Sequence, residues 1–179
     1  MKLSRTSDPL LNGARVLIYL IYAVLIFAIV MLAIGSVAIG TVGRGQLLAE
    51  LAKVGAPAGG IWLIALAMVL IIALLGCAFR FVQRLLEIVN SVGGGDPFDP
   101  RNADRLAAMG WFAVAGQVLV VPLIAIAAWF EPYLEKAGEH ADVGFDVDPG
   151  AILLILILFI LARVFRKGAE MRAELEGTV

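Results

Sequence analysis

Long apolar runs separated by short polar segments dominate this chain. Three of these runs, at 16–39, 61–81 and 107–130, each hold about 20 residues or more. A helix rises about 1.5 Å per residue, so runs of this length are long enough to cross the hydrocarbon layer of a membrane. Because backbone polar groups in lipid must be satisfied within the segment, the three runs predict membrane-spanning helices.

A fourth apolar run, at 150–166, is interrupted by Arg163 near its end. An arginine at the end of a span can extend its guanidinium to the lipid headgroups, so the run is included as a span. Asp148 followed by Pro149 is a typical helix start, since aspartate caps free backbone amides and proline fits the first helical position. The sequence therefore predicts an all-α fold, an integral membrane four-helix bundle that forms a single domain over residues 1–179.

Two of the spans are predicted to continue as amphipathic helices beyond the membrane. The second is followed by an apolar stripe at helical spacing that ends at the glycines 93–95: Phe81, Leu85, Ile88 and Val92. The fourth is followed by a comparable face: Leu161, Phe165, Gly168 and Arg172. Arg166, Glu170 and Glu174 are spaced for i,i+4 contacts along that helix. We expect the two extensions to pack on each other or to lie against headgroups.

Composition strengthens the membrane assignment. The chain is 61% hydrophobic and only 16% charged, with a mean hydropathy of +0.96, which excludes an ordinary water-soluble domain of this length. The first apolar run is longer than the roughly 7 to 15 residues of a cleaved signal sequence, so we expect a signal anchor. Cys77 is the sole cysteine and excludes a disulfide within the chain.

The placement of Lys and Arg predicts the orientation, because cytoplasmic segments carry the excess of these residues. Most of the 14 lie before the first span, between the second and third, and after the fourth: Lys2, Arg5, Arg15, Arg80, Arg84, Arg101, Arg105, Arg163, Arg166, Lys167 and Arg172. The remaining connections hold Arg44, Lys53 and Lys136. We expect both termini (N-in, C-in), the turn at 93–105 and the extensions of the second and fourth helices in the cytoplasm, and the acidic loop at 131–148 outside.

The turn "GGGDPFDPRNADRL" at 93–106 is the most distinctive polar segment. Its glycines permit positive φ at a helix end, and Pro97 fixes a turn. Asp99 or Asn102 is predicted to cap the helix that follows. Phe98 is an aromatic in polar surroundings, so it is either tucked beneath the extended second helix or presented to a partner. Its chemistry alone favours the tuck.

Signals for catalysis or metal binding are few. His140 lies in the acidic loop without the spacing of a zinc or EF-hand site, which favours a solvated loop. The glycine run lacks the lysine and hydroxyl residue of a phosphate-binding loop. Arg101, Asp104 and Glu170 are the nearest approach to an acid–base cluster, and an ion-pair network explains them equally well. We therefore expect no catalytic residue, no metal and no cofactor, and a protein that is not an enzyme.

Two segments, "GDPFDPRNADRLAAMGW" at 95–111 and "LARVFRKGAEMRAELEGTV" at 161–179, resemble the signature segments of the DUF2975 family of small bacterial four-span membrane proteins. The positions that match are Gly95, Pro97, Phe98, Asn102, Leu106, Leu161, Phe165, Gly168, Glu174, Thr178 and Val179. Met171 and Gly177 stand where the family commonly has leucine, so the last helical turn is expected to be looser.

The resemblance implies a location in the bacterial inner membrane and a regulatory role, because members of this family are often encoded beside a small helix-turn-helix protein. We expect a regulator or anchor that binds this cytoplasmic partner and does not itself bind nucleic acid, with a homo-oligomer as a further candidate. The resemblance also favours Phe98 as a partner anchor. The candidate partner-binding residues are Gly95, Asp96, Pro97, Phe98, Arg101, Asn102, Arg105, Phe165, Arg166 and Glu174.

The alternative function is a small transporter or channel subunit. It requires a polar path, for which Gln117 and Tyr22 are the candidate lining residues within the spans. Hydrogen bonding between helices explains Gln117 more simply, since no other strongly polar residue lies at the same depth. No acid or base lies in the middle of a span, which weighs against proton-coupled transport.

Overall fold

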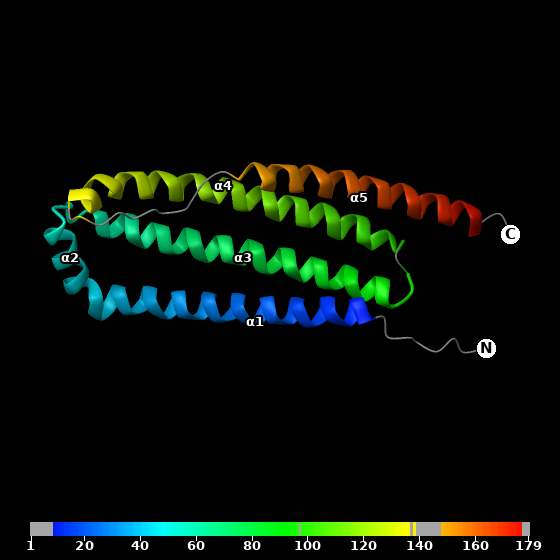
Figure 1. Ribbon diagram of the computed structural model, residues 1–179, viewed down its shortest axis with the longest axis horizontal. Helices are drawn as coiled ribbons and strands as arrows, with labels where there is room; N and C mark the ends of the chain where they lie inside the picture. The colour runs from blue at the N-terminus through cyan, green and yellow to red at the C-terminus, as the bar shows by residue number, and fades with distance from the viewer. Residues whose placement is uncertain (1–8, 97, 137, 139–147, 177–179) are drawn as a thin grey trace. The chain divides into compact units, whose positions relative to one another are not determined.

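The elements are helices throughout the residues that this computed structural model describes, which are 9–96, 98–136, 138 and 148–176 (Figure 1). In chain order they are α1 (Pro9–Ala38), the π-helical turn η1 (Ile39–Gly43), α2 (Arg44–Lys53), α3 (Gly60–Gly93), α4 (Pro100–Lys136) and α5 (Pro149–Glu176). The all-α prediction is confirmed for the described part of the chain.

Several helix ends fall where the sequence predicted them. The long helix α3 ends at Gly93, and Gly95 adopts a positive φ of 89°, which an L side chain rarely adopts. The next helix, α4, begins at Pro100, and the Asp99 carboxylate accepts a hydrogen bond of 2.9 Å from the Arg101 N–H. Asp99 is therefore the cap of α4. The last helix, α5, begins at Pro149 as expected.

In the described part of the chain, four helical segments are long and apolar enough to cross a membrane: Leu11–Lys53, Gly60–Gly93, Pro100–Glu135 and Pro149–Leu175. Many of their large apolar side chains, such as Leu20, Phe27 and Ile160, are more than half exposed. Water would oppose so much exposed apolar surface, whereas lipid is its natural solvent. The chain is thus a multi-pass membrane protein, as predicted, and α3 and α5 continue well past the predicted limits of their spans.

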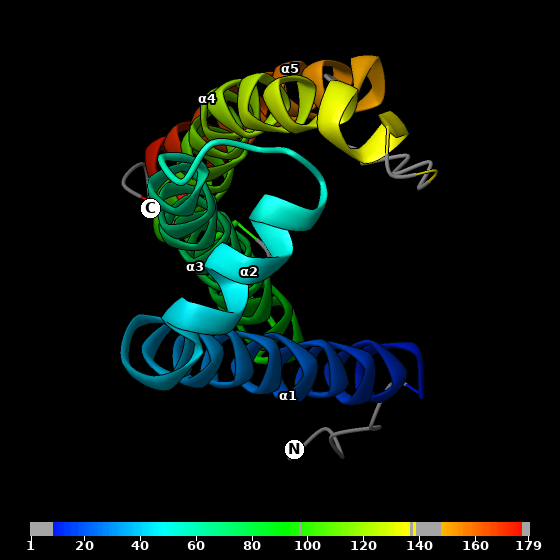
Figure 2. The ribbon, with the colours of Figure 1, turned by 90° about the vertical axis from the view of Figure 1, so that its left-hand side faces the viewer.

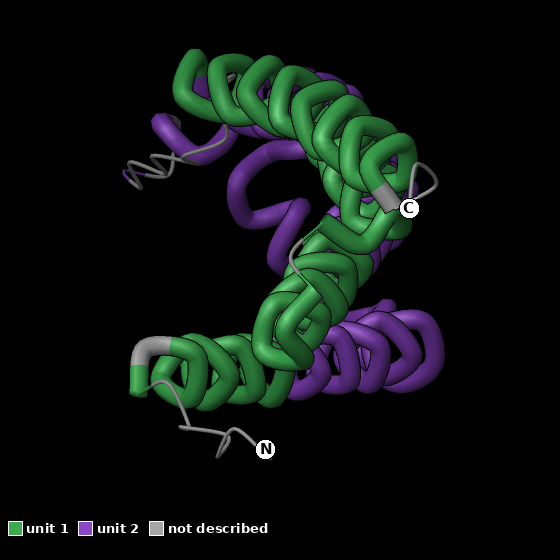
Figure 3. The backbone as a smooth tube through the Cα atoms, turned by 90° about the vertical axis from the view of Figure 1, so that its right-hand side faces the viewer, with its two compact units in different colours: residues 1–25, 78–114, 149–179 green, residues 26–77, 115–148 purple. Residues whose placement is uncertain are grey.

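The chain divides into two compact units (Figure 3), and each contains parts of several helices. Unit 1 consists of residues 1–25, 78–114 and 149–179. Its core is formed where α4 meets α5, by Leu106, Met109, Leu158 and Ala162. The predicted stripe of α3 contributes Phe81, Leu85 and Ile88 to this core, and α5 contributes Phe165. The two helical extensions therefore bury their apolar faces in one cluster.

Unit 2 consists of residues 26–77 and 115–148. Here the start of α3 approaches α4 closely, since a Cβ on Gly60 would lie 3.2 Å from the Trp129 ring. Trp129 also packs edge-on against Phe130, with ring centroids 4.8 Å apart, and lies near Tyr133. This aromatic cluster fixes the place where the two helices meet.

The first connection contains more regular structure than the sequence indicated. The chain continues from α1 through the π-turn η1 directly into α2, a ten-residue helix. At this turn α2 departs from the direction of α1 (Figure 2). An exposed ion pair of 2.6 Å joins Lys53 to Glu50 within α2. This short helix is mostly polar on its outer side, so hydropathy alone gave no sign of it.

Candidate partner-binding surface

The turn between α3 and α4 is held by a buried hydrogen-bond network. Asn102 is fully buried, at 0% exposure, and its amide donates to the Ser91 hydroxyl at 2.9 Å. The same hydroxyl donates to the backbone carbonyl of Asp96 at 2.8 Å. Through Ser91, the first turn of α4 and the turn residue Asp96 are both tied to the end of α3. This network gives the loop a defined conformation, because each buried polar group requires its partner.

Charged side chains extend this network along α3. Arg105 donates to the side-chain amide oxygen Oδ1 of Asn102 at 2.7 Å and to the Glu87 carboxylate at 3.1 Å. Glu87 also accepts from Arg84 at 2.9 Å, and Asp99 lies 3.8 Å from Arg105. Arg105 is mostly buried, so its ion pair with Glu87 is only partly screened by solvent.

The turn also docks on α5, and we call this contact the clasp: Asp96, Phe98 and Asp104 on one side, and Phe165, Arg166, Gly168 and Arg172 of α5 on the other. The Phe98 ring packs against Phe165 with centroids 5.9 Å apart. A Cβ on Gly168 would lie 3.1 Å from the Phe98 ring. Gly168 therefore leaves room for the Phe98 ring, and both residues are parts of the clasp.

Two ion pairs flank the ring contact. Arg172 donates to the Asp96 carboxylate at 2.6 Å, and Arg166 donates to Asp104 at 3.0 Å. The predicted i,i+4 pairing of Arg166 with Glu170 is wrong: Arg166 reaches across to α4, and Glu170 accepts from Lys167 at 3.2 Å instead. The start of α4 lies beside α5, so the Asp104 carboxylate of α4 is within reach of Arg166.

The position of Phe98 differs from the predicted tuck in one respect. Its ring lies against α5, whereas the sequence placed it beneath the extended second helix. The ring also remains 45% exposed. Phe98 thus has both features considered for it, one face packed within the clasp and one face open. Met171, on the same turn of α5 as Gly168 and Arg172, is 50% exposed.

Beside the clasp, α4 and α5 enclose a groove of about 520 Å³. Its floor is apolar, and its walls carry three cationic side chains and one carboxylate: Ala107, Phe159, Ala162, Arg163, Arg166, Lys167 and Glu170. Arg163 forms no ion pair among the residues that the structure describes. A cation without an ion pair beside an apolar floor is a combination that an acidic, partly apolar protein surface would fit.

The other predicted site residues are spread around the turn. Gly95 lies at its positive-φ position, Arg101 is exposed in the first turn of α4, and Glu174 lies in the last described turns of α5. Pro97 lies outside the described residues, as do Thr178, Val179 and the histidine of the acidic loop. The structure thus brings together most, but not all, of the candidate residues.

Sequence reasoning missed several members of the site. Ser91 and Glu87 lie in the predicted extension of the second helix and were not singled out, although they hold Asn102 and Arg105. Asp104 and Arg172 were not recognised as partners of the turn. The available signal was the face formed by Phe165, Gly168 and Arg172, which contacts the turn along its whole length.

The candidate acid–base residues are engaged in ion pairs. Asp104 pairs with Arg166, and Glu170 pairs with Lys167. Within the described ranges, no group of three or more His, Cys, Asp or Glu side chains is arranged to hold a metal ion. The expectation that the protein is not an enzyme stays a prediction.

These features define a class: a helical, multi-pass membrane protein whose α3–α4 turn is locked onto its last helix. Within this class, the chain belongs to the DUF2975 family, described as a protein of unknown function, whose model matches residues 40–179. The match begins at the π-turn and includes both signature segments, so the family assignment made from those segments is confirmed. No curated protein and no solved structure matches the chain.

Proposed function

We propose that this protein is a regulator or anchor in the bacterial inner membrane, and that the clasp is its docking surface for a cytoplasmic protein. The observation that carries the proposal is the state of Phe98. Its turn is fixed by a buried network, yet nearly half of the aromatic ring stays exposed. A rigid, partly exposed aromatic flanked by charged groups has the properties of an interface anchor.

The orientation belongs to this proposal. With both termini in the cytoplasm, the clasp faces the cytoplasm as well, since the α3–α4 turn and the end of α5 lie on the side where basic residues are concentrated. On this arrangement α3 and α5 extend into the cytoplasm. The partner is a small helix-turn-helix DNA-binding protein, held at the membrane and thereby kept from its DNA.

The test is crosslinked affinity purification of the tagged protein from its native membrane. The wild type is compared with Phe98→Ala and with a truncation after Arg166, which removes the half of the clasp that contains Gly168 and Arg172. Phe27→Ala is the matched control, because Phe27 is a phenylalanine on α1 in the other unit that is even more exposed than Phe98. Expression and membrane insertion must be equal in all four proteins.

We expect the wild type and Phe27→Ala to recover a helix-turn-helix protein that both clasp variants lose. The recovered protein is then purified and its direct binding is measured, with and without its DNA. Equal recovery by all four proteins, or recovery by none, would contradict docking at the clasp and leave it a folding element. The alternative of a transporter or channel subunit is then tested by flux measurements in vesicles.

A further inference from the structure

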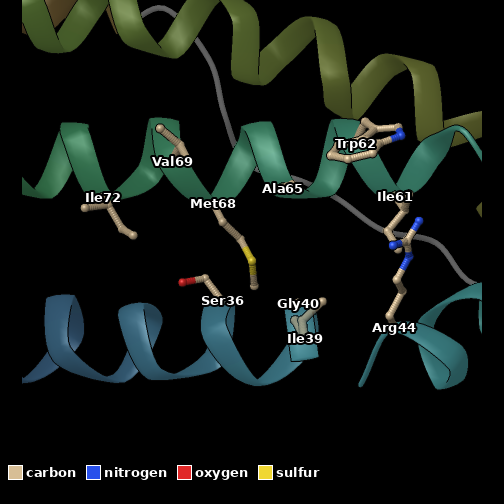
Figure 4. A pocket seen from close by; sticks show the side chains of 10 residues that line it. All are labelled: Ser36, Ile39, Gly40, Arg44, Ile61, Trp62, Ala65, Met68, Val69 and Ile72. Carbon is tan, nitrogen blue, oxygen red and sulfur yellow. The ribbon is translucent and has the colours of Figure 1, made fainter. Parts of the chain in front are cut away.

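A cleft separate from the clasp lies in unit 2, between the end of α1 and the first half of α3 (Figure 4). Its volume is about 280 Å³. Its lining comes from α1, η1, the first residue of α2, and α3: Ser36, Ile39, Gly40, Arg44, Ile61, Trp62, Ala65, Met68, Val69 and Ile72. Nearly all of these side chains are apolar, so the wall of the cleft is apolar with very few polar groups.

The cleft has one charged end. Figure 4 shows the Arg44 side chain reaching toward Ile61 at the end where α3 begins. Among the described residues, Arg44 forms no ion pair or hydrogen bond. The other polar lining residue, Ser36, already donates its hydroxyl proton to the Ala33 carbonyl at 2.8 Å. A ligand therefore meets a single unpaired cation and, beyond it, an apolar surface.

The length of the cleft matches the depth of one lipid leaflet. From Ile61 to Ile72 the α3 helix rises about 17 Å, and half of a hydrocarbon layer is about 15 Å. Trp62 is 70% exposed at the charged end, which is the usual place of tryptophan at the membrane interface. Arg44 then lies at the level of the headgroups, and Ile72 lies near the middle of the bilayer.

We propose that this cleft binds an anionic phospholipid, with the headgroup phosphate on Arg44 and one acyl chain along α3 as far as Ile72. The charge of Arg44 selects an anionic headgroup, and the leaflet-long apolar wall selects an acyl chain. Residues 9–38 and 60–86 contain no carboxylate, so these parts of α1 or α3 from a second copy would leave Arg44 unpaired. The exposed Val69 marks the open side through which lipid enters from the bilayer. This inference is independent of the proposed partner.

One of the two glycines of the π-turn, Gly40, provides a way to block the cleft. Gly40 lines it, and a Cβ at Gly40 would meet no heavy atom within 4 Å. Gly40→Leu therefore puts a side chain into the cleft with little strain. Gly45 has equally open surroundings but does not line the cleft, so Gly45→Leu is the matched control.

The experiment uses Trp62 as its reporter. In the full chain carrying Trp111→Phe and Trp129→Phe, Trp62 is the only indole. The protein is reconstituted in phosphatidylcholine vesicles in which either phosphatidylglycerol or phosphatidylcholine carries brominated chains, and quenching of Trp62 gives the relative affinity for the two lipids. Native mass spectrometry of the unmodified protein measures lipid retention without these substitutions.

We expect phosphatidylglycerol to be preferred at Trp62 by about fivefold, the effect of one cation near a membrane surface. Arg44→Gln should bring the ratio to about one, and Gly40→Leu should reduce quenching by both lipids. Lys53→Gln, which removes a charge from the same helix away from the cleft, and Gly45→Leu should behave as the wild type. Equal affinity for the two lipids, an unchanged preference in Arg44→Gln, or loss of quenching through dimerisation would overturn the proposal.

Discussion

Asn102 joins Ser91 of α3 to Arg105 of α4 while being completely buried itself. The sequence offered this residue as a possible helix cap, as part of a family motif and as a candidate partner-binding residue. Spacing could not decide between Asp99 and Asn102 as the cap, because both lie at the start of the same helix. The structure separates the two roles: Asp99 caps α4, and Asn102 holds the turn against α3.

Replacing Asn102 by alanine is therefore expected to destabilise the protein by about 2 to 3 kcal/mol, since it leaves the Ser91 hydroxyl and the Arg105 guanidinium short of a partner in a buried site. The measurement is the free energy of unfolding in a detergent titration. Asn90→Ala is the control, because Asn90 lies directly before Ser91 on α3 but its side chain is exposed. Equal stability of the two variants would show that the network does not hold the turn.

At the scale of helices, the apolar runs and the cap–proline signals were sufficient to predict the four long helices. They were insufficient for α2, because a short helix continuing from a π-turn carries no long apolar run. They were also insufficient for the clasp, where the Phe98 ring packs on α5, at Gly168, and not beneath α3. The helix that receives the ring depends on how the helices pack together, and a single sequence does not show this directly.

A second glycine, Gly110, marks a tight contact between α4 and α5. A Cβ on Gly110 would lie 3.0 Å from the Phe159 ring, which in turn packs edge-on against Trp111. Gly110→Ala should therefore cost about 1 to 2 kcal/mol of stability, because the ring must move within a packed contact. Gly76→Ala, on α3 with no heavy atom within 4 Å, should be neutral in the same unfolding measurement. Equal effects of the two substitutions would refute a tight contact at Gly110.

At the scale of the whole molecule, the proposed orientation rests on the distribution of basic residues and can be measured directly. In a Cys77→Ser background, a cysteine is introduced at an exposed alanine of α2 (Ala52→Cys) or near the end of α5 (Ala173→Cys). A membrane-impermeant maleimide should label Ala52→Cys in intact cells and Ala173→Cys only after the membrane is opened. The opposite pattern would reverse the assignment and remove the clasp from the cytoplasm.

The π-turn at Ile39–Gly43 has a consequence for how this segment can change during evolution. Its hydrogen bonds span five residues, one more than those of an α-helix. Loss of one residue here would produce an uninterrupted α-helix, so that α2 would continue along the axis of α1 and no longer depart from it (Figure 2). Arg44 would then leave the charged end of the cleft. The number of residues in this short stretch, more than their chemical nature, determines where the Arg44 side chain lies. The stretch should therefore accept many substitutions and no deletions.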